Sequence, residues 1–235
     1  MEVEDQTGPL IQVYVIVAWA AIVLVAVVSG LIYRRIAVAD LVYETEGRSV
    51  ALVQQFISTS WPELRALARE APELSADELR EHREAEEAGR ALLTLAEAPA
   101  VLKVRLYGAL GLIVASTEIS EIGRHTSDAV VLEMAAGRWW SQGRPGAESR
   151  LERIETFQTQ DETLRNVDLV ITHVMIRRDP VTPDRTGEAV LAIYQEVGAA
   201  MSRIRTTQFL AMGSLIVAAT LVGGVIWFQR RRTGD

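Results

Sequence analysis

Two long apolar segments constrain what this chain can fold into more than any other feature. Residues 13–33 and 209–228 contain no charged side chain and enclose residues 34–208, which have a mixed composition. A helix rises about 1.5 Å per residue, so about 20 residues cross a hydrocarbon core of about 30 Å. Both segments are that long, and neither would place an ion in lipid. The sequence therefore predicts two transmembrane helices, flanked by tails of residues 1–12 and 229–235.

The first apolar segment has a competing interpretation as a cleaved signal peptide. A signal peptide begins with a positive region and has a shorter apolar centre. Here the preceding residues include Glu2, Glu4 and Asp5 and no lysine or arginine, and the apolar segment is longer. We therefore expect an uncleaved membrane anchor.

The arginines near the two anchors bear on orientation. Residues 230–232 are all arginine, which favours termini in the cytoplasm. Arg34, Arg35, Arg203 and Arg205 lie at the opposite ends of the anchors, but long loops cross the membrane largely regardless of charge.

The chain has no cysteine, which excludes disulfides and cysteine metal sites. We expect a bacterial inner (cytoplasmic) membrane protein with residues 34–208 outside the cytoplasm.

Residues 36–58 carry one apolar stripe with three-and-four spacing, which predicts a helix. Glu46 interrupts this stripe. Two interpretations remain open: the helix packs on its own domain, or it also pairs with a second copy in a homodimer. The stripe consists of Ala39, Tyr43, Val50, Val53 and Ile57. Small residues spaced by four in the second anchor would permit close helix approach in such a dimer. They are Ser214 with Ala218, and Ala219 with Gly223.

The remaining pattern predicts an α+β domain. Pro62 opens a short helix, and Ser75 with Glu78 forms a capping box for a helix that continues to about Glu97. A helix over residues 127–140, capped by Ser127 or Asp128, interrupts a series of segments with the alternation of strands. These strands span residues 101–107, 112–116, 149–157, 169–177 and 189–197, with loops near residues 143–146 and 179–187. The expected sheet is antiparallel and five-stranded.

Residues 101–124, VLKVRLYGALGLIVASTEISEIGR, resemble the signature region of Cache-type extracytoplasmic sensor domains. Tyr107, Gly111, Ser116, Ile122 and Gly123 occupy matching positions. Residues 168–176 and 187–197 are similar to the last two strands of sensor regions that precede diguanylate cyclase or histidine kinase modules. The resemblance covers residues 36–208 and implies a PAS-like single Cache domain that binds a small ligand between two anchors.

This chain departs from the resembling sensors in two places. Ile171, His173 and Met175 stand where those sensors often carry a carboxylate and a tyrosine in the penultimate strand. The chain also stops at Asp235, where an output module would begin. We therefore expect either the sensory part of a longer signalling protein or a receptor without an attached effector.

The sequence shows no motif for chemistry of its own. It has no nucleophile motif, phosphate-binding glycine loop or metal-spaced histidine set. His82, His125 and His173 fall on separate expected elements, and His82 lies among the mixed charges of a solvated helix face. The net charge of −7 gives no reason to expect nucleic acid as a partner. We expect neither catalysis nor a cofactor or metal.

Five side chains are candidates for ligand binding. His173 lies within an apolar strand, where a buried imidazole either donates to a ligand or is satisfied by a neighbouring residue. Arg105 and Tyr107 share one face of a strand and would hold an anion, or they face solvent. Tyr194 and Trp139 either line a pocket or are core aromatics.

Two classes of function agree with these features. The first is a membrane-anchored receptor whose outer domain binds a small molecule and passes a conformational change to the second anchor. The second is an anchored interaction protein whose domain docks a protein partner. An enzyme whose catalytic part lies beyond these residues is a third interpretation, which a longer reading frame would test.

Overall fold

The computed structural model describes residues 7–136, 139, 146–159, 162–177 and 187–233. Contacts divide the chain into two compact units. One comprises the described residues up to Asp40 and from Ala200 onward, and the other is Leu41–Ala199. Trp140 and most of the expected loops at residues 143–146 and 179–187 lie outside the described residues.

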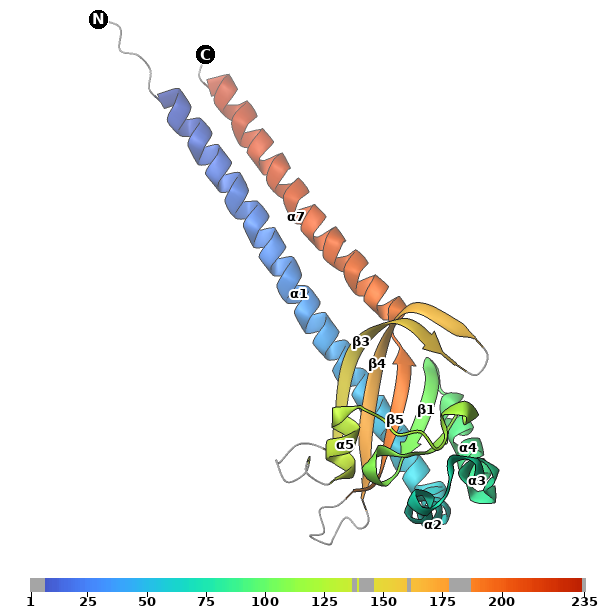
Figure 1. Ribbon diagram of the computed structural model, residues 1–235. Coiled ribbons are helices and arrows are strands. Elements are labelled where there is room, and N and C mark those ends of the chain that lie inside the picture. The colour runs from blue at the N-terminus through green and yellow to red at the C-terminus, as the bar shows by residue number, and fades with distance from the viewer. Residues whose placement is uncertain (1–6, 137–138, 140–145, 160–161, 178–186, 234–235) are drawn as a thin grey trace, which may run out of the picture. The chain divides into compact units, whose positions relative to one another are not determined.

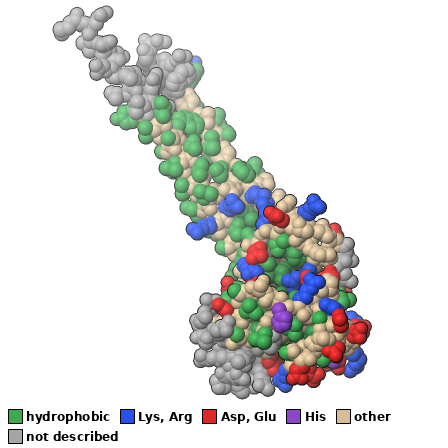
Figure 2. Space-filling model, in the orientation of Figure 1, with side chains coloured by type: hydrophobic (Ala, Val, Ile, Leu, Met, Phe, Trp, Pro, Cys, Tyr) green, Lys and Arg blue, Asp and Glu red, His purple; other side chains and the backbone are tan. Residues whose placement is uncertain are grey.

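The first unit consists of parts of two long helices, α1 (Thr7–Thr59) and α7 (Gly198–Thr233). Both are long and apolar enough to cross a membrane, and few residues in their most apolar stretches are buried. Hydrophobic side chains cover the described surface of this unit (Figure 2). The helices pack closely at Gly30, where an added Cβ would lie 2.5 Å from the Met212 sulfur. Gly223 lies against Trp19.

The second unit begins with residues 41–59 of α1. It continues with α2 (Trp61–Glu70), a 3-10 turn η1 (Ala71–Glu73), α3 (Ala76–Glu81) and α4 (Arg83–Ala96). The expected capping box is confirmed, because Glu78 N–H donates to Ser75 Oγ and Ser75 N–H donates to the Glu78 carboxylate.

The expectation of one helix from Ser75 to Glu97 is wrong. His82 adopts an extended conformation (φ −70°, ψ 130°) that separates α3 from α4. The break lets both helices direct apolar side chains into one core, with Leu79 from α3 and Leu92 from α4 fully buried. A continuous run of charged residues conceals this break in the sequence.

Five antiparallel strands form one sheet, which confirms the α+β prediction. They are β1 (Val101–Tyr107), β2 (Ile113–Ser116), β3 (Ala147–Gln158), β4 (Thr163–Arg177) and β5 (Gly187–Glu196), in the spatial order β2-β1-β5-β4-β3 (Figure 1). A 3-10 turn η2 (Ala109–Gly111) joins β1 to β2. Gly111 has φ +75° there, and a Cβ would lie 2.8 Å from both the Leu132 and Thr126 side chains, so glycine is required.

Only part of the helix expected over residues 127–140 falls on described residues, because residues 137, 138 and 140 lie outside them. The helix α5 spans Ala129–Ala135, and Ala136 is its C-cap. Asp128 rather than Ser127 caps its start, because the Asp128 carboxylate accepts a hydrogen bond of 3.0 Å from Val130 N–H. Trp139 lies beyond the end of α5.

The two faces of the sheet bury separate apolar cores. One core lies between the sheet and α1, α2 and α4, and includes Val53 and Phe56 of α1. The other lies on the side of α5. Strand side chains alternate between them, since Leu191 and Ile193 enter the first core while Ala192 enters the second.

The apolar stripe predicted on residues 36–58 is divided between two environments. Val53 is fully buried, and Val50 and Ile57 pack against the first core, so this half follows the interpretation of packing on the same domain. Tyr43 is 80% exposed. Instead, Ser49 and Thr45 are the buried residues in this part of α1. Their hydroxyls donate to backbone carbonyls one turn earlier in the helix.

Candidate ligand-binding site

The second face of the sheet gathers polar residues from three strands. Arg105 on β1 pairs in register with Ala192 on β5, which pairs with His173 on β4. Lys103 pairs with Tyr194 in the same way. Because directly paired residues point to the same face, these side chains share one surface. Four of the five predicted site residues, Arg105, Tyr107, Tyr194 and His173, therefore lie on this face.

An ion cluster anchors the β1 side of this face. The Glu121 carboxylate, on the 3-10 turn η3 (Ile119–Glu121), accepts two hydrogen bonds from Arg105, one of them 2.7 Å long from Nε, and one of 3.0 Å from Lys103 Nζ. Ser116 Oγ also donates to Glu121 at 3.1 Å. Lys103 is 2% exposed, so two cations meet one carboxylate in a largely buried place.

Two tyrosines extend this cluster across the sheet. Arg105 Nη1 donates to the Tyr194 hydroxyl at 2.7 Å, and the Tyr107 and Tyr194 hydroxyl oxygens are 3.4 Å apart. The Arg105 guanidinium also lies 4.9 Å from the centre of the Tyr194 ring, a cation–π distance. Tyr107 is buried and Arg105 half-buried, and they contact each other rather than forming a solvent-facing edge. We call the group Lys103, Arg105, Tyr107, Glu121 and Tyr194 the sheet-face cluster.

Burial and charge fix the protonation of the sheet-face cluster. Burial by itself would raise the pKa of Glu121, but the hydrogen bonds and charges of Arg105 and Lys103 outweigh it and lower that pKa. Burial, followed by the neighbouring Tyr107, raises the pKa of Tyr194, which stays a neutral hydroxyl. The cluster thus carries two positive charges and one negative charge, and the excess positive charge favours an anion beside it.

His173 is the most buried polar group on this face. It is 0% exposed, and neither ring nitrogen has a hydrogen-bond partner within the part of the chain that the structure describes. The nearest charged atom is Asp128 Oδ2, 3.6 Å from Nε2, and Arg150 holds that carboxylate through two hydrogen bonds. Burial lowers the pKa of His173 to about 4; Asp128 opposes this shift, and the charges of Arg150 and Arg105 add to it.

Trp139, the fifth predicted site residue, is 3% exposed and belongs to the same apolar core as Tyr107 and Tyr194. It is therefore a core aromatic on the second face of the sheet, which is one of the two interpretations that the sequence left open. The five candidates thus lie on one side of the sheet, and Arg105, Tyr107 and Tyr194 contact one another there through polar atoms no more than 3.5 Å apart.

Sequence reasoning missed three charged residues that organise this face. The period-two pattern of residues 101–107 places Lys103 on the same face as Arg105 and Tyr107, but Lys103 was not among the predicted site residues. Asp128 was expected only as a helix cap, yet its carboxylate also faces His173 and binds Arg150. Glu121 gave no signal, because its contacts join residues 16 and 18 positions apart through a fold that the sequence pattern does not specify.

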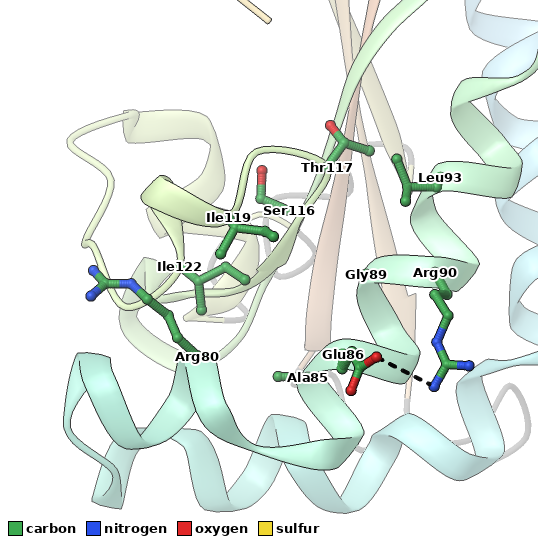
Figure 3. Close-up of a pocket in the computed structure, with 10 residues that line it drawn as sticks. All are labelled: Arg80, Ala85, Glu86, Gly89, Arg90, Leu93, Ser116, Thr117, Ile119 and Ile122. Atoms are coloured by element: carbon green, nitrogen blue, oxygen red, sulfur yellow. Dashed lines mark ion pairs between the residues drawn. The ribbon is translucent and has the colours of Figure 1, made fainter. Parts of the chain in front are cut away.

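A separate pocket of about 160 Å³ lies between α4 and the segment that follows β2 (Figure 3). Its apolar side chains lie between two arginines, Arg80 at one end and Arg90 at the other (Figure 3). It is lined by Arg80, Ala85, Glu86, Gly89, Arg90, Leu93, Ser116, Thr117, Ile119 and Ile122. None of the five predicted site residues lines it.

Comparisons with known proteins add no family to this description. No protein-family model and no curated protein sequence matches the chain. Among the described residues, no group of three or more histidine, aspartate or glutamate side chains is arranged to hold a metal ion. The candidate site therefore has to be interpreted from its own chemistry, as a largely buried cluster with an excess of positive charge.

Proposed function

We propose that this protein is a membrane-anchored receptor whose outer domain, residues 34–208, binds a small ligand on the second face of the sheet. The resemblance to Cache-type sensors and the strand order β2-β1-β5-β4-β3 support a PAS-like domain. The two long apolar helices support two membrane anchors, with the domain outside the cytoplasm of a bacterium. No catalytic role is part of this proposal.

The observation that carries the proposal is the buried imidazole of His173, which has no hydrogen-bond partner among the described residues. Leaving a buried polar group without a hydrogen bond costs about 1–3 kcal/mol, so native proteins rarely do so without a functional reason. A ligand atom that donates to or accepts from His173 would remove this cost. Tyr194 on the neighbouring strand β5 and Arg105 on β1, the next strand beyond it, have the hydroxyl and charge that would orient a polar ligand.

The connection from β5 to α7 gives ligand binding a route to the membrane. The strand β5 supplies Tyr194 and ends at Glu196, and α7 begins two residues later at Gly198. A shift of β5 on ligand binding would therefore be transmitted directly into the second anchor. A ligand drives such a switch only through different affinities for two states, and about 5.5 kcal/mol of difference is needed for a nearly complete switch.

The test of this function is ligand binding by the His173→Phe variant. Thermal unfolding of the protein against organic acids, amino acids and amines should identify one stabilising class, because a ligand that binds only the native state raises its stability. His173→Phe should then abolish binding while the protein remains folded. If the variant loses stability but its folded fraction keeps the wild-type affinity, His173 is a structural residue and the proposed site is wrong.

Docking of a protein partner is the second candidate function. It is favoured by an exposed groove beside residues 48–55 of α1. The groove has a volume of about 440 Å³ and includes Arg48, Leu52 and Gln55 of α1, with Pro99 and Gln195 beside them. A protein partner would use this surface rather than the buried face. Such a protein would show no small-molecule stabilisation that is lost in His173→Phe, which separates it from the receptor.

We also propose that the receptor is a parallel homodimer through the exposed side of α1. Ala39 and Tyr43 lie one turn apart on that side, whereas Ser49 and Val53 are fully buried. Single cysteines at Ala39 and Tyr43 should form disulfides between copies in membranes, and cysteines at Ser49 and Val53 should not. Failure at all four positions would remove the dimer. Gly223 does not add a free surface to this interface, since it lies against Trp19 of the same chain.

A further inference from the structure

The pocket between α4 and the segment after β2 combines an apolar interior with cationic ends. Its size, about 160 Å³, is close to that of an engineered apolar cavity of about 150 Å³ that binds benzene. Leu93 and Ile119 contribute large apolar side chains that are 43% and 63% exposed. An aromatic ring or a branched aliphatic group placed between these side chains would cover apolar surface that now faces water.

Gly89 keeps this pocket open at a cost to its own helix. It lies in the interior of α4, where glycine is less stabilising than alanine. A Cβ at Gly89 would meet no atom within 4 Å, so packing against the rest of the protein does not require glycine. The feature that glycine does provide is the open space beside the helix, because any larger side chain would project into the pocket.

The two arginines give the pocket a preference for anions. Glu86 is the carboxylate in the lining, and its pairing with Arg90 is weak, because the atoms are 3.9 Å apart and both side chains are mostly exposed. Arg80 binds Asp77 through Nη1 at 2.7 Å, but its buried Nε has no hydrogen-bond partner among the described residues. An acceptor at the Arg80 end would gain from the charge of this guanidinium.

The geometry points to a second ligand site in this pocket, which takes a small carboxylate with a compact apolar body. The apolar group lies over Gly89 between Leu93 and Ile119, and the carboxylate accepts from Arg80. This inference does not rest on the proposed receptor function, since the pocket shares no residue with the sheet-face cluster and binding is measured without a signalling output.

The test uses sodium benzoate as the probe and the full chain in nonionic detergent, with binding measured by isothermal titration calorimetry at pH 7. We expect saturable binding that weakens at least tenfold in Gly89→Leu, whose side chain fills the pocket. Gly47→Leu is the matched control, because Gly47 is also inside a helix with no atom within 4 Å of an added Cβ. This control should bind benzoate as the wild type does.

Two further measurements define the chemistry and the place. Benzamide, which has the same shape without the charge, should bind at least tenfold more weakly than benzoate, and Arg80→Gln should remove most of that difference. His173→Phe should leave benzoate affinity unchanged. The proposal is overturned by an absence of saturable binding up to the solubility of sodium benzoate, or by wild-type affinity in Gly89→Leu. Equal affinity for benzamide, or loss of binding in His173→Phe alone, would overturn it too.

Discussion

Glu121→Gln is expected to lower the free energy of unfolding by about 3–5 kcal/mol, the cost of leaving a buried charge without its partner. Glutamine preserves the size of the side chain but removes the negative charge that Lys103 and Arg105 share. The Lys103 side chain is 3% exposed and that of Arg105 is 22% exposed, so water can replace the lost carboxylate only in part, at Arg105. The change is measured by urea denaturation in detergent, followed by tryptophan fluorescence.

Glu118→Gln is the matched control for this experiment. Glu118 lies three residues earlier, and its carboxylate accepts only an exposed hydrogen bond of 3.1 Å from Ser120. Surface substitutions of this kind usually change stability by less than about 0.5 kcal/mol. A loss below about 1 kcal/mol in Glu121→Gln would contradict the view that Glu121 holds the two cations together.

The effect of Glu121→Gln should also depend on pH in a defined direction. The folded protein holds the pKa of Glu121 below its ordinary value, because Arg105 and Lys103 outweigh the effect of burial. Its stabilising contribution is therefore complete above the unfolded pKa and is lost as the pH falls through the folded pKa. Wild type and variant should converge in stability in acid and differ most near neutral pH.

Local patterns were sufficient to predict the elements that depend on local physics. Alternation in residues 101–107 located β1, and the apolar run at the start of residues 189–197 located β5, which is buried on both faces. The Ser75–Glu78 capping box needs only two side chains one turn apart, and it formed as expected. The α+β class followed from the order of these segments.

Features that depend on contacts between residues far apart in the sequence were not predicted. The break at His82 exists because α3 and α4 must both reach one core, and no breaker residue marks it. Glu121 lies in a short turn with no periodic pattern, yet it holds two residues of β1. The pocket at Gly89 depends on the approach of Ile119 to α4, which only the folded chain defines.

The candidate site shows the same division between local and distant contacts. The alternation of β1 correctly placed Arg105 and Tyr107 on one face, and the apolar strand around His173 correctly predicted its burial. The contacts that give these residues their chemistry come from elsewhere in the chain. Asp128 reaches His173 from the cap of α5, and Tyr194 reaches Arg105 across 89 residues.

Burial of His173 also predicts a large loss of stability in acid. Its pKa is about 4 in the folded protein against an ordinary value of 6.5, so the unfolded chain takes up a proton between these values while the folded protein does not. The direction is therefore destabilising as the pH falls from 6.5 to 4. Each pKa unit corresponds to about 1.4 kcal/mol, so the loss approaches about 3 kcal/mol at pH 4.

His173→Phe should remove this loss, because phenylalanine has no proton to take up and fills a similar volume. Urea denaturation of wild type and variant at pH 7, 6, 5 and 4 should show the variant gaining about 3 kcal/mol relative to the wild type across the series. Asp128 and Arg150, which face His173, are present in both proteins, so the variant changes the imidazole alone.

His82→Gln provides the matched control for the pH series. His82 is partly exposed and pairs with Glu84, and this variant still contains His173. Its stability should therefore follow the wild-type dependence on pH. If wild type and His173→Phe instead gave parallel curves between pH 7 and 4, His173 would have to accept a proton as readily in the folded protein as in the unfolded chain. The imidazole would then already have an acceptor or water contact, and the argument that a ligand completes its hydrogen bonding would fail.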